Sequence, residues 1–211
     1  MEALASYLEL RGINDMIESI MASGIRAAAI VENMLSFSRK GGYRFERENL
    51  VMLLDKTIEL ASNDYDLKKK FDFRGIQIHR EYQTDMPLIP CEAAKIQQVF
   101  LNLLQNGAQA MAGFARDDEK RTPRFVLRIG IEENSARIEI EDNGPGMDEP
   151  LRKRAFEPFF TTKEVGKGTG LGLSVSYFII TENHGGKMSV VSSAGNGAQF
   201  IIHLPLERSE P

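Results

Sequence analysis

The stretch RFVLRIGIEENSARIEIED, residues 124–142, decides the fold class of this chain. Its apolar residues alternate on both sides of the predicted two-residue turn Asn134-Ser135, and this pattern is typical of two antiparallel strands joined as a hairpin. Residues 187–193 and 198–206, separated by a glycine-containing turn at 194–197, predict a second, C-terminal hairpin. The sequence therefore predicts a largely antiparallel sheet.

Helical segments are predicted before and between these strands. Asn49 can cap a helix that runs to about residue 69, residues 75–82 alternate like a strand, and a longer helix is predicted over residues 92–114. Another helix begins near Thr169. Runs of helix and strand in this order predict an α/β (α+β) two-layer sandwich with a mixed, mostly antiparallel sheet.

The first 44 residues predict a separate helical unit. From Ile13 to Leu35 the apolar residues recur at helical spacing, and Gly41 follows two cations that suit a helix C-terminus. We expect residues 1–44 to form part of a dimerisation helix, because a single amphipathic helix of that length cannot bury its apolar stripe alone. Residues 45–211 are then expected to form the second domain.

Composition excludes several classes of protein. The 211 residues carry a net charge of −4, which gives no general attraction to nucleic acid. Cys91 is the single cysteine, so an intramolecular disulfide framework is excluded and a reducing compartment is favoured. No signal peptide or membrane-spanning stretch is recognised, and we expect no membrane contact by this chain and a cytoplasmic location.

Asp142 is the most informative position in the chain. It continues the inward-facing alternation of Ile138 and Ile140, so its carboxylate is expected on the core side at the end of a strand. A buried carboxylate needs hydrogen-bond donors, and the amino group of adenine is one candidate. The alternative is an aspartate that caps the turn at residues 143–146.

Polar, uncharged side chains recur at three- and four-residue spacing on the long predicted helix. They are Gln98, Asn102, Asn106 and Gln109. Carboxamides can both donate and accept hydrogen bonds, and they can lie beside a metal ion and phosphate in a partly closed site. The alternative is an ordinary solvated helix face.

Glycines alternate in GKGTGLGLS, residues 166–174, directly before a predicted helix. Without Cβ atoms, backbone N–H groups can converge on an anion, which favours phosphate binding over a simple flexible hinge. Just before this stretch, FEPFFTTK, residues 156–163, places aromatic side chains beside hydroxyls and a cation. It predicts a lid or docking surface, with packing onto the core as the alternative.

These segments carry a family resemblance. QQVFLNLLQNGAQAM (97–111), EIEDNGPGM (139–147), FEPFFTTK and GKGTGLGLS resemble, in this order, the N, G1, F and G2 boxes of histidine kinases of the GHKL ATPase superfamily. GIRAAAIVENMLSFSRK (24–40) resembles the second dimerisation helix of such kinases. The short lid and FEPFFTTK look most like the nitrogen-regulation type. The resemblance implies a Bergerat ATP-binding fold from about residue 45 onward.

The resemblance also implies roles for individual residues. Asp142 would accept a hydrogen bond from the adenine amino group, Asn106 would coordinate Mg²⁺, and Phe159 and Phe160 would position the lid between the G1 and G2 boxes. The other residues implied to bind ATP are Asn102, Gln109, Gly144, Gly146, Met147, Thr162, Lys163, Lys167, Gly168, Thr169, Gly170, Leu171, Gly172 and Leu173. The cofactors would be ATP and Mg²⁺.

Three features depart from the family pattern. Gly107 replaces the usual alanine, which would loosen the helix because glycine costs about 1 kcal/mol relative to alanine. Ala198 stands where a threonine is usual, so a water-mediated contact to adenine is in doubt. The phosphoacceptor histidine is missing, because His79, His184 and His203 all lie outside a dimerisation helix and are expected to be structural. The acceptor is expected on a helix before Met1.

As a whole, the resemblance implies the catalytic domain of a sensor histidine kinase. It would transfer the γ-phosphoryl group of ATP to a histidine of a homodimeric dimerisation domain, and a response regulator receiver domain would then accept the group. This chain alone is not expected to autophosphorylate. The alternatives are a GHKL-type ATPase, or a nucleotide-binding module without phosphotransfer; the polar helix face lacks the catalytic glutamate usual in the hydrolysing members.

Overall fold

The computed structural model describes residues 45–63, 73–117, 122–163 and 168–207, together with Ile13, Met16, Ile20 and Gly24. These four residues are helical, and Met16 and Ile20 are 63% and 71% exposed. The rest of the predicted dimerisation helix and the boundary near Gly41 lie outside the described residues.

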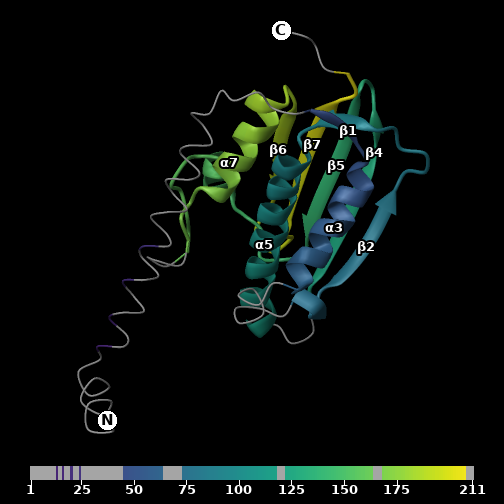
Figure 1. Ribbon diagram of the computed structural model, residues 1–211. Helices are drawn as coiled ribbons and strands as arrows, with labels where there is room; N and C mark the ends of the chain where they lie inside the picture. Colours follow the sequence, from purple (N-terminus) through teal and green to yellow (C-terminus); the bar gives the residue numbers. More distant parts are fainter. Residues whose placement is uncertain are drawn as a thin grey trace, which may run out of the picture.

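The described domain packs helices against one face of a five-stranded sheet (Figure 1). The strand order is β2-β4-β5-β7-β6, with β2 parallel to β4 and the other neighbours antiparallel. The strands are β2 Gln77–Tyr82, β4 Arg124–Glu132, β5 Ser135–Asp142, β6 Lys187–Ser192 and β7 Ala198–Pro205. The predicted two-layer sandwich with a mixed, mostly antiparallel sheet is confirmed.

The helices are α3 Leu50–Asn63, α5 Ala93–Asp117, α6 Glu149–Arg154 and α7 Gly172–Phe178, and a π-helical turn, Ile179–Asn183, continues α7. Helices α3, α5 and α7 lie together on the side of the sheet that faces the viewer in Figure 1. The long predicted helix is slightly longer than expected, and the helix predicted from about Thr169 begins at Gly172. The predicted helix after Asn49 is described to residue 63, and the rest of that prediction lies outside the described residues. A short 3₁₀ turn, Phe73–Gly75, comes before β2.

One local expectation is corrected, and two features are added that the sequence did not predict. The β4–β5 turn is Glu133-Asn134 rather than Asn134-Ser135, because Glu132 pairs with Ser135 and Glu133 adopts a positive φ of 53°. The stretch expected to be a lid contains α6, which Asp148 caps by accepting a hydrogen bond from the Leu151 N–H. Two short strands, β1 Glu46–Glu48 and β3 Ile89–Cys91, form a separate antiparallel pair that the sequence did not predict.

The core lies between the helices and the sheet. Ile96, Val99 and Leu103 of α5 are at most 1% exposed, and Ile138 and Ile140 of β5 are at most 2% exposed. Burying an aliphatic side chain of this size stabilises a fold by roughly 1.5–3 kcal/mol. The inward alternation predicted for β5 is confirmed, and it continues to Asp142, which is 6% exposed.

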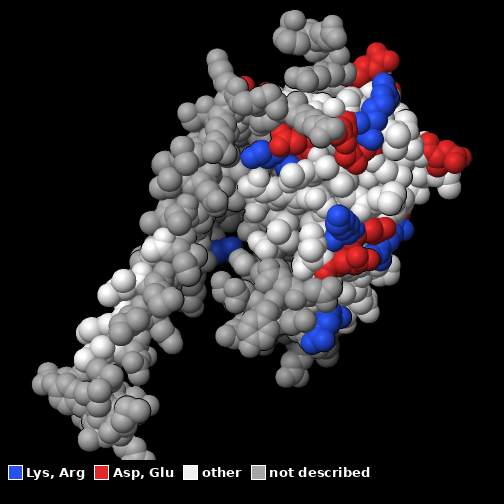
Figure 2. Space-filling model, in the orientation of Figure 1, with Lys and Arg blue, Asp and Glu red and all other residues white. Residues whose placement is uncertain are grey.

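The opposite face of the sheet is covered by an ion-pair network. Glu139 alternates with the buried isoleucines of β5, so its side chain lies on the other face of the sheet. It accepts hydrogen bonds from Arg128, Arg137 and Gln199. These partners leave Glu139 only 8% exposed. Acidic and basic side chains are also intermixed among the coloured residues on the face seen in Figure 2. Among the described residues, the ion-pair network and the face in Figure 2 therefore both lack the basic stripe that is typical of nucleic-acid binding.

His184 joins segments far apart in the sequence. Its Nε2 accepts a hydrogen bond from the Glu92 N–H at 3.1 Å, and its Nδ1 lies 2.7 Å from the carbonyl oxygen of Ile179. A carbonyl accepts only, so Nδ1 carries the proton and both ring nitrogens are used. The Phe45 ring packs against the imidazole at 5.0 Å. His184 thus has a structural role, as predicted.

Candidate functional site

A cavity of about 420 Å³ opens between the helix layer and the end of the sheet that carries Asp142. Its wall comes from α5, the loop after β5, α6, the segments on both sides of residues 164–167, and β7. The lining residues are Asn102, Gln105, Asn106, Gly107, Gln109, Ala110, Asp142, Pro145, Gly146, Met147, Leu151, Ala155, Phe160, Thr161, Thr162, Lys163, Gly168, Thr169, Gly170, Gly172, Leu173, Ala198 and Phe200.

Asp142 is the buried charge of this cavity. It ends β5, where it pairs with Ala198 of β7. Its Oδ1 accepts a hydrogen bond from the Gly144 N–H at 2.9 Å. Burial raises the pKa of the Asp142 carboxyl, and the backbone N–H groups of Gly144 and Ala198 oppose this by stabilising the ionised form. The carboxylate is therefore held in place as a hydrogen-bond acceptor.

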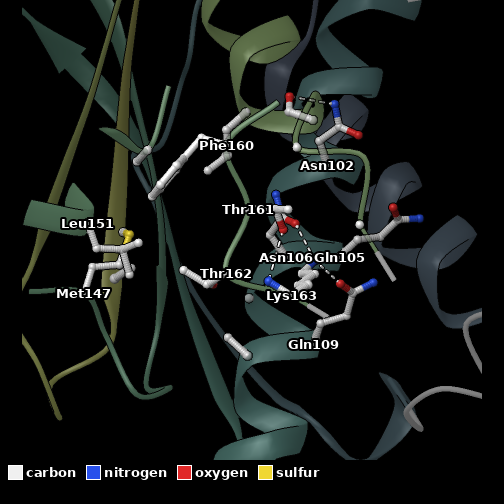
Figure 3. A pocket seen from close by; sticks show the side chains of 18 of the residues that line it. Asn102, Gln105, Asn106, Gln109, Met147, Leu151, Phe160, Thr161, Thr162 and Lys163 are labelled. Atoms are coloured by element: carbon white, nitrogen blue, oxygen red, sulfur yellow. Dashed lines mark hydrogen bonds between the residues drawn. The ribbon is translucent and has the colours of Figure 1, made fainter. Parts of the chain in front are cut away.

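The part of the cavity that contains Met147 and Leu151 is apolar. These two side chains lie next to each other (Figure 3), and Ala155 and Phe200 also line the cavity. Gly146 brings the loop close to the neighbouring hairpin: its φ is 68°, and a Cβ atom there would lie 2.0 Å from the carbonyl oxygen of Ser193. An apolar wall with one buried acceptor suits a flat heterocycle that carries an amino group.

The opposite part of the cavity is polar. Asn102, Asn106 and Gln109 of α5 and the Lys163 ammonium lie there (Figure 3). Lys163 Nζ donates hydrogen bonds to Asn106 Oδ1 at 3.4 Å and to Gln109 Oε1. Two carboxamide oxygens therefore point to one cationic group. This is the donor-and-acceptor chemistry that phosphate and its counter-cation require.

The glycine-rich segment closes this polar part. Gly170 has a φ of 66°, and a Cβ there would lie 2.4 Å from the backbone carbon of Phe159. Phe159 itself has a positive φ of 65° and is 55% exposed. The two backbones touch, so the aromatic and glycine-rich segments form one wall. Phe160 turns into the cavity with the Arg154 guanidinium 4.1 Å from its ring centre.

Comparison with known proteins identifies this arrangement. The family model described as "Histidine kinase-, DNA gyrase B-, and HSP90-like ATPase" matches residues 91–208. The chain belongs to this ATPase family. The match contains both the Asp142 strand and the glycine-rich segment.

Named relatives narrow the family to sensor kinases. The chain is 33% identical to Sporulation kinase E of Bacillus subtilis (strain 168) over 184 residues, which are 87% of this chain and 23% of that protein. It is also 33% identical to the Sensory histidine kinase/phosphatase NtrB of Vibrio alginolyticus over 211 residues, 98% of this chain and 57% of that protein. The chain thus spans only part of the length of these relatives.

Similar solved structures are also histidine kinases. The nucleotide-free catalytic domain of histidine kinase ThkA is 28% identical with a TM-score of 0.62, covering 77% of this chain and 96% of that domain. ThkA in complex with the response regulator protein TrrA is 25% identical with a TM-score of 0.69, covering 94% of this chain and 52% of that one. This ATPase-family chain therefore contains the ATP-binding catalytic domain of a sensor histidine kinase.

Most of the predicted site residues meet at the cavity of this ATPase domain. Gly144 and Leu171 lie beside it: Gly144 supplies a backbone N–H to Asp142 from behind, and Leu171 is buried at 2% exposure as the residue before α7. Gln98 is not among the lining residues. Lys167 lies outside the described residues. Phe159 does not line the cavity and is 55% exposed. The other residues predicted to bind ATP all line it.

Several lining residues were not predicted. Leu151 and Ala155 stand one helical turn apart across α6, and this spacing was a signal that could have been used. Gln105 directly precedes Asn106 in the sequence. Phe200 lies on β7 opposite Ile140, so only the β5–β7 pairing brings it to the cavity.

The structure adds a role for Gly107 that the sequence did not indicate. A Cβ there would lie 2.6 Å from Cε1 of Phe125, and contacts under 3.0 Å force a shift. Gly107 therefore leaves room for the Phe125 ring beneath the helix.

The polar part of the cavity also suits Mg²⁺, because a carboxamide oxygen can coordinate this ion. No group of three or more His, Cys, Asp or Glu side chains suited to a metal occurs among the described residues. Mg²⁺ commonly uses one or two protein oxygens and completes its shell with water and substrate phosphates. Asn106 Oδ1, which already faces a cationic nitrogen, is a suitable protein ligand.

Proposed function

We propose that this chain binds Mg-ATP in the cavity and, in the whole protein, transfers the γ-phosphoryl group to a histidine of a dimerisation domain. Residues 1–44 would belong to that domain and residues 45–211 would form the catalytic domain. None of His79, His184 and His203 would be the acceptor, since all three lie in the catalytic part. The acceptor would come from another part of the protein.

The observation that carries this proposal is the Asp142 carboxylate in an otherwise apolar part of the cavity. It is 6% exposed, and two backbone N–H groups hold it in place. Leaving such a carboxylate without a ligand is costly, because burial disfavours its charged form. An adenine amino group would give it a further donor, while Met147 and Leu151 would contact the ring.

The remaining site residues would position the phosphates. Mg²⁺, when bound with ATP, would neutralise charge on the β- and γ-phosphates. Asn106 would supply an oxygen to the ion, and Lys163 would give up its bonds to Asn106 and Gln109 to contact phosphate. Phosphoryl transfer depends mainly on positioning and charge stabilisation, so this domain needs no nucleophile of its own.

The proposed partners follow from the relatives. ThkA is known in complex with a response regulator protein, and we infer that a receiver domain takes the phosphoryl group from this kinase as well. The same proposal includes a homodimer through the N-terminal helix and a cytoplasmic location of this part. It also includes membership of the nitrogen-regulation type, which the similarity to NtrB supports. None of the described helices has the length and apolar character needed to cross a bilayer.

ATP hydrolysis without phosphotransfer is the second candidate. It is supported by the family description, which includes gyrase- and HSP90-like ATPases. The polar face of α5 carries carboxamides at Asn102, Asn106 and Gln109, where a hydrolysing member would need a general base for water. Phosphotransfer is therefore favoured.

The test has two stages. Calorimetric titration with Mg-ATP should show one saturable site in the wild type and no binding in Asp142→Asn, whereas Glu141→Gln, the neighbouring carboxylate on the opposite sheet face, should bind as the wild type does. Labelled ATP is then mixed with the chain and a histidine-bearing dimerisation domain of a relative. Label on that histidine supports the proposal. Nucleotide binding followed only by phosphate release would favour the ATPase instead.

A further inference from the structure

Asn102 is tied to α7 through its amide nitrogen. Nδ2 donates hydrogen bonds to the carbonyl oxygen of Gly172 and to Ser176 Oγ, both at 3.3 Å. In Figure 3 the amide nitrogen lies at a dashed line, with the amide oxygen turned the other way. Ser176 is 0% exposed and does not line the cavity, yet it contacts a residue that does.

The hydrogen atoms of this group decide its orientation. The Ser176 hydroxyl donates its single hydrogen to the Gly172 carbonyl oxygen at 2.8 Å. Its oxygen can therefore only accept from Asn102. The Gly172 carbonyl is also an acceptor, so α7 presents two acceptors to the Asn102 amide nitrogen.

A flipped Asn102 amide would place oxygen against two acceptors. Both hydrogen bonds would be lost. The oxygen would be repelled by the Gly172 carbonyl, and the Ser176 hydroxyl could donate to it only by giving up its own bond to Gly172. In the observed orientation Nδ2 faces the two acceptors of α7, and Oδ1 takes no part in these hydrogen bonds. An oxygen that only accepts suits a hydrated cation better than a phosphate oxygen, which is itself an acceptor.

We propose that Ser176 is a positioning residue that holds the Asn102 amide with its oxygen toward the Mg²⁺ side of the nucleotide site. The inference rests on the proposed function. It assigns to α7 a part in metal-dependent ATP binding, through a buried hydroxyl that touches neither metal nor nucleotide. Groups that orient metal ligands in this way typically change metal affinity 10–100-fold when removed.

Ser176→Ala tests the proposal, with Ser174→Ala as the matched control. Ser174 is also buried, at 6% exposure, and its hydroxyl donates to a carbonyl oxygen of its own segment, Leu171, at 3.0 Å. ATP affinity is measured calorimetrically with and without Mg²⁺. We expect Ser176→Ala to reduce the Mg²⁺-dependent gain in ATP affinity about tenfold, with metal-free ADP affinity unchanged and the gain intact in Ser174→Ala.

A mutant cycle separates positioning from packing. In an Asn102→Ala background, Ser176→Ala should produce no further loss, because the group it positions is already gone. An equal loss in both serine variants, an unchanged Mg²⁺ dependence in Ser176→Ala, or the full loss in the Asn102→Ala background would overturn the proposal. If Ser176→Ala does not fold, Ser176→Cys replaces it, since sulfur is a weak acceptor of similar size.

A nucleotide-free measurement separates this inference from the proposed function. The side-chain N–H₂ group of Asn102 should exchange slowly with solvent in the ¹⁵N-labelled wild type and in Ser174→Ala, and at least tenfold faster in Ser176→Ala. If the wild type bound no nucleotide, the proposed function would fail. The exchange rate of the Asn102 side-chain amide would still report its hydrogen bond to Ser176. Equal exchange in all three chains would overturn the positioning role.

Discussion

Gly107 of α5 lies directly against the ring of Phe125 on β4. A Cβ atom at Gly107 would come within 2.6 Å of Phe125 Cε1 and within 3.2 Å of the Asp142 Cβ. The absence of one side chain lets the helix that carries the polar site residues approach the strand that carries the buried carboxylate. The distance between the two parts of the nucleotide site thus depends on a helical glycine.

Gly107→Ala is expected to destabilise the domain by about 1–3 kcal/mol, as overpacking does, although alanine favours a helix by about 1 kcal/mol. Urea unfolding measures the effect. Phe125→Leu in the same chain should recover part of the loss, because it frees the space that the new methyl group needs. A Gly107→Ala variant more stable than the wild type would show that α5 moves away without cost.

Asp142→Asn is expected to stabilise the nucleotide-free protein while removing nucleotide binding. Burial raises the pKa of this carboxyl above its ordinary value of 3.8, so the native state holds its proton more tightly than the unfolded state does. The free energy of unfolding therefore falls as the pH rises from the ordinary pKa through the raised native-state pKa. Above the native-state pKa the fall is complete. The carboxamide of the variant does not ionise, and that fall should be missing.

Thermal unfolding between pH 3.5 and pH 8 measures this difference without nucleotide. Nucleotide affinity of the wild type should also weaken at low pH, since a protonated Asp142 has lost acceptor capacity. A pH dependence unchanged by Asp142→Asn would contradict the assignment.

Lys163→Met is expected to weaken ATP binding about tenfold, the effect of one lost charge-assisted hydrogen bond. ADP affinity should change less, because Lys163 lies on the polar side of the cavity, at Asn106 and Gln109. Calorimetry with both nucleotides gives the ratio. Lys153→Met removes an exposed lysine from α6 and should leave both affinities unchanged; an equal loss for ATP and ADP would place Lys163 away from the γ-phosphate.

Asn49→Ala is expected to cost about 1 kcal/mol of stability without affecting nucleotide affinity. The Asn49 side chain accepts a hydrogen bond from the Met52 N–H at 3.1 Å at the start of α3, and no part of α3 lines the cavity. Denaturant unfolding measures the loss. Asn49→Asp keeps a capping oxygen and should recover most of it, whereas a loss common to both variants would point to a different role for this side chain.

Sequence periodicity was sufficient for the sheet and the main helices. It placed Asp142 on the core side because side chains in a strand alternate, and this depends only on local geometry. The carboxamide residues of α5 were likewise predicted to share a face from their spacing, and the structure brings Asn102, Asn106 and Gln109 to one cavity. The family boxes then supplied the functional interpretation.

Short elements escaped prediction because their stability comes from contacts with distant segments. The strands β1 and β3 are three residues each and pair across a long stretch of intervening sequence. Helix α6 has six residues, none of them buried, and its start depends on the Asp148 cap. Such segments are too short for periodicity to distinguish from a loop.

By itself, the sequence determined the fold class and the order of the main elements, because these follow from local alternation and spacing, while the family resemblance implied the residues proposed to bind a nucleotide. Only the tertiary structure decided that Gly107 makes room for Phe125, that Ala198 pairs with Asp142, and that Ser176 faces Asn102. Each of these relationships joins segments far apart in the chain. Their geometry depends on strand register and on the close packing of side-chain volumes, which no single segment specifies.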